Sequence, residues 1–193
     1  MFRKTILILL GLFPALLFAD WQVDPEGSYI GFASVKNDLI VENHSFTQVT
    51  GIVSKTGEVR IKINLASVET LIPIRNERMQ SMLFEIATYP TAEVKSLVDV
   101  DEFTSLAVGE NKMLNIDMTV DLHATQLKKS VLVKVTRSSD NSFEVTSLGP
   151  IVVHASQFSM AEGVEALRKI AGLQSIDLMV PVTFDVRLVA KQP

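Results

Sequence analysis

The sequence contains no cysteine, and it has only one tryptophan and two tyrosines among its 193 residues. Without cysteine the chain has no disulfide, no lipoprotein attachment site and no thiolate ligand for a zinc ion. So few tryptophans and tyrosines cannot form the two aromatic girdles that flank the lipid-facing band of a transmembrane β-barrel. The domain must therefore be stabilised by its core alone, which a chain of this length can achieve.

The sequence also lacks an apolar run long enough for an ordinary membrane-spanning helix. Its main apolar run, residues 6–17, is interrupted by Gly11 and Pro14. It is shorter than the roughly 20 residues that cross a bilayer. An uncleaved membrane anchor is therefore the weaker of two interpretations of this run.

The flanks of this apolar run favour a secretory signal. Arg3 and Lys4 precede it and the small residue Ala19 follows it, which is the order of the charged, apolar and cleavage regions in such signals. We predict a signal peptide over residues 1–19, a single exported domain over residues 20–193, and a periplasmic location.

The predicted mature chain has no excess of positive charge. Two of the 18 Lys and Arg residues lie in the predicted signal, which leaves 16 against 22 Asp and Glu, a net charge of −6. Nucleic acids and anionic membrane surfaces attract basic proteins. The charge balance therefore argues against both as partners.

The dominant pattern in the sequence is an alternation of apolar and polar residues with a period of two. Between Ser175 and Ala190 every second residue is apolar, so a strand here has one wholly apolar face. Similar segments predict about eight strands, over residues 28–35, 40–53, 57–65, 92–100, 114–124, 128–135, 141–148 and 175–190. Turn residues such as those of 55–57 and 109–111 separate them, and the short connections favour antiparallel pairing.

Two segments depart from this alternation. Residues 73–85 and 161–172 space their apolar residues as one or more helical turns do, and Gly172 ends the second pattern. Both lie between predicted strands, so we expect one or two short helical insertions in a single sheet domain.

A sheet with one apolar face must bury that face. Two short helices cannot cover eight strands, whereas closure into a barrel covers the face and removes the edges. The inward rows consist mostly of Val, Ile, Leu and Met, and only seven Phe remain after the predicted signal, which leaves room for an apolar guest. A β-sandwich or a filled barrel uses the same alternation, so both stay open as alternatives.

Several motifs of the predicted mature chain resemble the YceI-like family. The opening segment matches at Trp21, Val23, Asp24, Pro25, Ser28, Ile30 and Phe32, and the next at His44, Phe46 and Gly51. The most distinctive block matches at Ser67, Val68, Thr70, Arg75, Met79, Phe84, Tyr89, Pro90 and Ser96, and residues 122–129 match a strand-turn-strand corner. The chain differs from the usual pattern at Asn76, where the family has Asp, and at His123 and Ala124, where it has a glycine.

This resemblance implies an all-β fold, an extended lipocalin-like barrel of eight antiparallel strands with an isoprenoid or other long-chain lipid in its interior. It implies a binding, carrier or sequestering protein rather than an enzyme. We also predict no cofactor, no nucleic-acid partner and no stable membrane insertion, with a homodimer as one option. An enzyme or electron-transfer accessory that acts on a bound isoprenoid or quinone is the alternative. We predict these ligand-binding residues: Phe32, Phe46, Ile63, Arg75, Met79, Met82, Phe84, Ile116, Met118, Val120, Phe158, Met160, Leu178 and Val180.

Each of these residues also has an ordinary structural interpretation. The methionines and phenylalanines of the non-strand segments fill irregular gaps in any core. Arg75 and Arg78 could bind a phosphate or carboxylate head group, but a solvated helix face is the favoured interpretation of both. The three histidines stand singly, so we predict no metal site. We find no motif for a catalytic nucleophile and predict no catalytic residue.

Overall fold

The computed structural model describes residues 19–191, and the predicted signal of residues 1–19 lies, apart from Ala19, outside the described residues. The strands are β1 (Ala19–Val23), β2 (Tyr29–Lys36), β3 (Ile40–Phe46), β4 (Val49–Ser54), β5 (Glu58–Asn64), β6 (Val68–Glu69), β7 (Thr91–Leu97), β8 (Asn111–Leu122), β9 (Thr125–Ser139), β10 (Ser142–Ser147), β11 (Ile151–His154) and β12 (Met179–Ala190). The helices are α1 (Pro73–Arg78), α2 (Asp101–Thr104) and α3 (Ala161–Ile170). A π-helical turn, Met79–Leu83, continues α1, and 3₁₀ turns cover Leu65–Ser67 and Ala155–Phe158.

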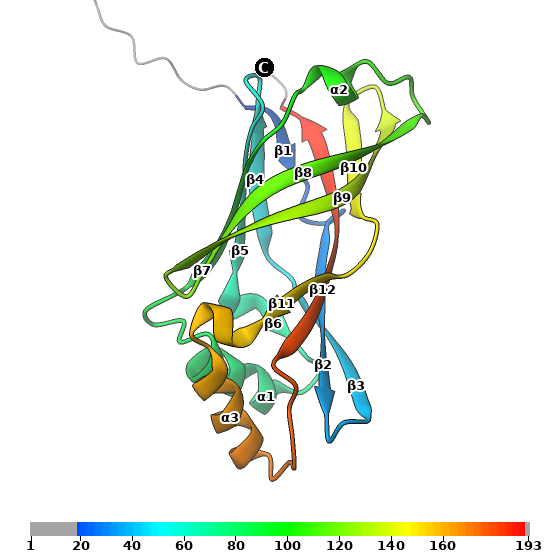
Figure 1. The fold of residues 1–193 in the computed structure, drawn as a ribbon. Coiled ribbons are helices and arrows are strands. Elements are labelled where there is room, and N and C mark those ends of the chain that lie inside the picture. Colours follow the sequence, from blue (N-terminus) through cyan, green and yellow to red (C-terminus); the bar gives the residue numbers. More distant parts are fainter. Residues whose placement is uncertain (1–18, 192–193) are drawn as a thin grey trace, which may run out of the picture.

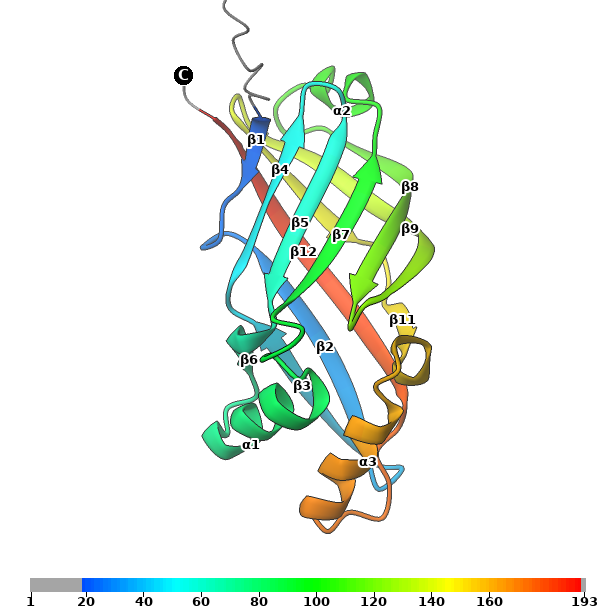
Figure 2. The same ribbon diagram turned by 90° about the vertical axis from the view of Figure 1, so that its left-hand side faces the viewer.

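Eight of these strands close into a barrel, as the sequence predicted. Hydrogen bonds join them in the order β1-β4-β5-β7-β8-β9-β10-β12, and β12 pairs with β1 to complete the ring. Every pairing in this ring is antiparallel. From β4 to β12 the ring follows chain order except where a helix or a side strand intervenes, which is the predicted meander (Figure 2).

The long strand β12 belongs to two regions of the molecule. Near its carboxyl end it pairs with β10 and β1, and near its start it pairs with β11 and β2. Strand β2 continues into the hairpin partner β3, which carries the short β6. The β2–β3 hairpin therefore extends the wall beyond the ring, alongside α1 and α3 (Figure 1).

The alternation of β8 and β12 places one apolar row of each on the inside. On β8 the inward row runs from Leu114 to Leu122, and on β12 it runs from Val180 to Leu188. The polar residues that alternate with the inward row of β8, such as Asn115 and Asp117, are exposed. The period-two pattern thus sets which face of each strand forms the core.

Different structures occupy the two ends of the barrel. At the end near α2, the rings of Trp21, Phe103 and Phe143 pack edge to face with centroids 5.2–6.0 Å apart. At the other end the π-helical turn packs against α3 (Figure 1). A Cβ at Gly163 would lie 2.6 Å from the Met82 carbonyl oxygen, so only glycine permits this approach.

Some element boundaries differ from those predicted. The predicted strand over residues 40–53 is two strands, because the backbone N–H groups of Thr47 and Gln48 bond to Ser67 instead of to a sheet neighbour. The predicted strand 175–190 begins only at Met179, whose N–H donates to the carboxylate of Asp177. The helical insertions at 73–85 and 161–172 are confirmed, and Gly172 ends α3 at a φ of +65°. Strands β1, β6 and β11 and helix α2 were not predicted.

Candidate functional site

An apolar cavity of about 310 Å³ runs through the barrel, at the lower end of the range of about 300–1,000 Å³ typical of ligand sites. Side chains from most strands of the ring, from β2, β3 and β11, and from the helical end form its wall. Among the described residues that form this wall, Ser96 alone has a polar side chain, and its hydroxyl donates to the Asp117 carbonyl oxygen at 2.7 Å. The wall therefore offers a guest almost no hydrogen-bonding group. It suits a hydrocarbon surface.

Ten of the fourteen predicted site residues lie on this wall. They are Phe32, Phe46, Ile63, Phe84, Ile116, Met118, Val120, Phe158, Met160 and Val180. Whether these residues contact a ligand stays a prediction, but the structure brings them together around one cavity. The filled interior that the alternation alone left open is not what the structure shows.

Three of the predicted apolar residues lie off the wall. Met79 is buried in the core, Leu178 packs against that core, and Met82 is half-buried. The π-helical turn explains the positions of Met79 and Met82. Its wider turn, closed by the bond from the Phe84 N–H to the Met79 carbonyl, directs Leu83 and Phe84 to the cavity instead. The ordinary helical spacing that we assumed does not predict which of Met82 and Leu83 faces the cavity.

Part of the wall was not predicted from the sequence. The inward row of β9, formed by Val131, Val133 and Val135, is buried and lines the cavity. Val164 of α3 and Leu83 do so from the helical end. The alternation of residues 128–135 already placed the three valines on one face, so that row could have been found. The contribution of α3 depends on long-range packing that no local pattern reports.

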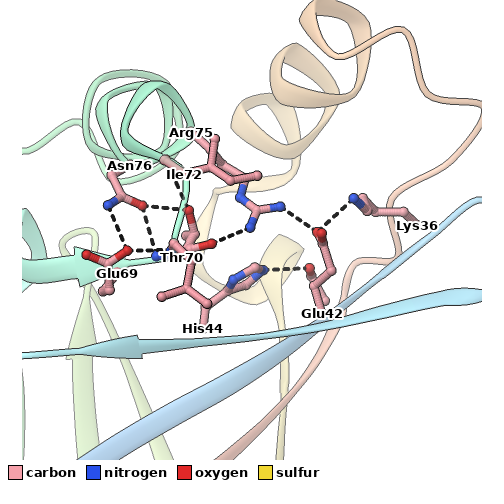
Figure 3. Close-up of polar contacts among 10 residues, drawn as sticks. Lys36, Glu42, His44, Glu69, Thr70, Ile72, Arg75 and Asn76 are labelled. Atoms are coloured by element: carbon pink, nitrogen blue, oxygen red, sulfur yellow. Dashed lines mark hydrogen bonds and ion pairs between the residues drawn. The ribbon is translucent and has the colours of Figure 1, made fainter.

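Beyond the apolar wall, the β2–β3 hairpin and α1 hold a polar cluster (Figure 3). Arg75 Nη1 donates to Glu42 Oε2 at 2.6 Å, and Lys36 Nζ lies 2.7 Å from the same oxygen. Arg75 Nη2 donates to the Thr70 carbonyl at 2.5 Å, and Ser34 Oγ lies 2.9 Å from His44 Nε2. Arg75 is therefore neither on the cavity wall nor on a free helix face. Its charge is paired with Glu42.

This cluster shifts the titration of two of its members. Partial burial opposes ionisation of Glu42, but hydrogen bonds from Arg75 and Lys36 outweigh it and lower the pKa of that carboxyl to about 2. Burial, and after it the charge of Arg75, lower the pKa of His44 below its usual 6.5. The imidazole is therefore uncharged at pH 7, beside an ionised Glu42.

We expect the Glu42 pair to make stability depend on acid pH. The unfolded carboxyl titrates near 4.5 and the folded one near 2, so stability is full above pH 4.5 and is lost as pH falls toward 2. Glu42→Gln should lower the free energy of unfolding at pH 7 by about 1–2 kcal/mol, because Arg75 and Lys36 lose a charged acceptor, and should flatten the loss between pH 4.5 and 2. Urea unfolding at pH 7, 4 and 2.5 measures both effects.

The control for this prediction is Glu26→Gln, which removes a carboxylate from an exposed loop. It should leave the unfolding free energy at pH 7 within about 0.5 kcal/mol of the wild type. An equal pH slope in the wild type and in Glu42→Gln would contradict the assigned role of the pair.

Among the described residues, no group of three or more His, Asp or Glu side chains is placed to hold a metal ion. Within residues 19–191, no helix is long and apolar enough to span a bilayer.

The sequence profile of the YceI-like domain matches residues 21–188. The chain belongs to the YceI-like family. The match starts at Trp21, the first residue of the motifs that resembled the family, and it covers nearly the whole described chain.

Solved structures agree with this assignment to the YceI-like family. The structure of "a polyisoprenoid binding domain from Saccharophagus degradans implicated in plant cell wall breakdown" matches with a TM-score of 0.88 and 35% identity, over 90% of this chain and 99% of that one. BcnA of Burkholderia cenocepacia matches with a TM-score of 0.66 and 16% identity, over 86% of this chain and 98% of that one. The Campylobacter jejuni YceI protein matches with a TM-score of 0.53 and 12% identity, over 77% of this chain and 85% of that one. The last two show a shared fold alone. Comparison with curated proteins gave no match.

Asn76 and the corner at His123 and Ala124, where the resemblance led us to expect other residues, make specific contacts in the structure. At Asn76, where the resemblance led us to expect Asp, the side-chain Oδ1 accepts hydrogen bonds from the Thr70 N–H at 2.9 Å and the Thr70 hydroxyl at 2.6 Å. At the corner between β8 and β9, His123 and Ala124 adopt φ values of +52° and +56°, where a glycine would be unstrained. The imidazole of His123 lies 2.7 Å from Glu85 and packs on the ring of Tyr89, with centroids 4.2 Å apart. These contacts hold the His123 side chain in place at the turn.

Proposed function

We propose that this YceI-like domain binds a long-chain apolar lipid, an isoprenoid, inside its barrel and carries or sequesters it in the periplasm. The observation that carries the proposal is the cavity wall, in which one serine is the only polar residue. The S. degradans relative, 35% identical, is described as a polyisoprenoid binding domain, which supports an isoprenoid in particular. The periplasmic location is inferred from the secretory signal predicted for residues 1–19.

The physical basis of the proposal is burial of hydrocarbon. Each methylene moved from water into such a cavity contributes roughly 0.8 kcal/mol, and about 1.4 kcal/mol changes an affinity tenfold. A tail of a few prenyl units therefore reaches micromolar binding without any polar contact. Binding of this kind requires no chemical step, so we propose a binding protein and not an enzyme. A homodimer stays a prediction.

A series of prenols of increasing length tests the function. We expect affinity to rise at least about tenfold for each added five-carbon unit, because ordering of the tail offsets only part of its burial. The rise should stop once the cavity is full. Displacement of a fluorescent fatty-acid probe, followed by isothermal titration, measures the series.

The same experiment needs a control for unspecific adsorption to apolar surfaces. Straight-chain diols, which carry a hydroxyl at both ends, should bind more weakly than prenols of equal carbon number. Affinity that does not change with prenol length would overturn the proposed function. Native mass spectrometry of protein purified from its own periplasm, with solvent extraction, then identifies the natural guest.

A further inference from the structure

The inner face of the β2–β3 hairpin changes from apolar to polar along its length. Its cross-strand pairs, from the ring outward, are Ile30 with Phe46, Phe32 with His44, and Ser34 with Glu42. Alternate residues of a strand share a face, so His44 projects to the same side as Phe46. Because Phe32 and Phe46 line the cavity, the apolar wall ends directly against His44.

His44 is buried there and lacks one hydrogen-bond partner. His44 is only 4% exposed. Its Nε2 pairs with the Ser34 hydroxyl, and its Nδ1 has no partner among the described residues. Its ring packs on Phe32 with centroids 5.2 Å apart. The Nε of Arg75, which belongs to the same cluster (Figure 3), is also buried without a partner. Unpaired buried polar groups are rare because each costs about 1–3 kcal/mol.

The charges of the cluster select the kind of group that could pair with these two nitrogens. Arg75 and Lys36 share the carboxylate of Glu42, at 2.6 and 2.7 Å, and the imidazole of His44 is uncharged at pH 7 because its pKa is lowered. A phosphate would lie beside the ionised Glu42 carboxylate and would have to compete with it for the same two cations. A hydroxyl, in contrast, accepts a bond from an arginine Nε–H and donates one to an uncharged imidazole nitrogen.

We propose that His44 Nδ1 and Arg75 Nε bind the uncharged oxygen head group, a hydroxyl, of the isoprenoid whose tail fills the cavity. This inference rests on the proposed function and adds to it the class of ligand and its direction. The head group lies at the end of the cavity next to the β2–β3 hairpin and α1. The tail extends past Phe32 and Phe46 into the ring.

Three ligands with one tail test the inference: geranylgeraniol, the hydrocarbon with a methyl in place of the hydroxyl, and geranylgeranyl phosphate. The wild type should bind the alcohol about three- to tenfold more tightly than the hydrocarbon, the worth of one or two buried hydrogen bonds, and should bind the phosphate more weakly than the alcohol. In His44→Phe, whose ring still packs on Phe32, the alcohol should lose its advantage over the hydrocarbon.

The matched control is His154→Phe, which removes an exposed histidine of β11 and should retain the preference for the alcohol. A second measurement does not depend on the variant folding: the ¹⁵N resonance of His44 Nδ1 in the wild type should shift with the alcohol and not with the hydrocarbon. A preference for the alcohol in His44→Phe, or tightest binding of the phosphate, would overturn the inference.

The outcomes also separate this inference from the function on which it rests. If alcohol and hydrocarbon bind the wild type with equal affinity, the head-group site is wrong and lipid binding stands. If none of the three ligands binds, the proposed function fails, and the inference fails with it.

Discussion

Replacement of Met118 by tryptophan is expected to reduce prenol affinity at least about 100-fold while the empty protein keeps or gains stability. Met118 stands in the inward row of β8, opposite Ser96 of β7, and its side chain lines the cavity. The added indole atoms would occupy the space that a lipid tail needs. Added atoms destabilise a close-packed core by about 1–3 kcal/mol, but in a hollow they gain contacts instead.

The two readouts of Met118→Trp are an affinity for geranylgeraniol and a free energy of urea unfolding without ligand. The matched control is Leu132→Trp, because Leu132 lies on the outer face of β9, between Val131 and Val133. This control should keep full affinity. If Met118→Trp kept its affinity and lost about 1–3 kcal/mol of unfolding free energy, the core would be filled, which would contradict the proposed carrier.

Much of this barrel was predictable because alternation is a local property of the sequence. The rows of β8 and β12, including Ile116, Met118 and Val180, line the interior as their period predicted. Leu178, which was predicted on the same row, precedes β12 and lies off the wall. The turn at Gly57 and the end of α3 at Gly172 were likewise visible in short stretches. In each case the residues that determine the feature lie within a few positions of one another.

Ring closure depends on contacts that alternation does not report. Strand β1 has only five residues, and its role follows from pairing with β4 and β12, which lies about 170 positions away. For the same reason the break between β3 and β4, caused by Ser67, was not visible. The local sequence thus indicated well which segments form strands. It did not indicate which of these strands complete the ring.

The polar cluster shows the same limit at the site. Arg75 and Glu42 are 33 positions apart, and neither residue alone indicates a pair. Arg75 was therefore interpreted as a head-group ligand through its charge, whereas the structure leaves only its Nε unpaired. His44 was matched only as a motif residue, because its burial follows from the hairpin register.

The second large effect is expected at Gly57, in the turn between β4 and β5. Gly57 has a φ of +83°, and a Cβ there would lie 1.8 Å from the Val98 carbonyl oxygen. The Gly57 carbonyl also accepts the Val98 N–H at 2.9 Å, which holds the two backbones together. We expect Gly57→Ala to lower the free energy of unfolding by about 3–5 kcal/mol, because backbone strain adds to a contact that only movement of the chain can relieve.

Gly109→Ala separates the two causes. Gly109 has nearly the same φ, +88°, but no atom lies within 4 Å of its added Cβ. The free energy of unfolding of this variant should therefore fall only by the cost of the backbone strain, about 1–2 kcal/mol. Equilibrium unfolding in urea, with the m-value checked for two-state behaviour, gives both numbers. Equal losses in the two variants would mean that β5 and β7 separate freely at this edge, so the close approach to Val98 would contribute nothing to the stability of the ring.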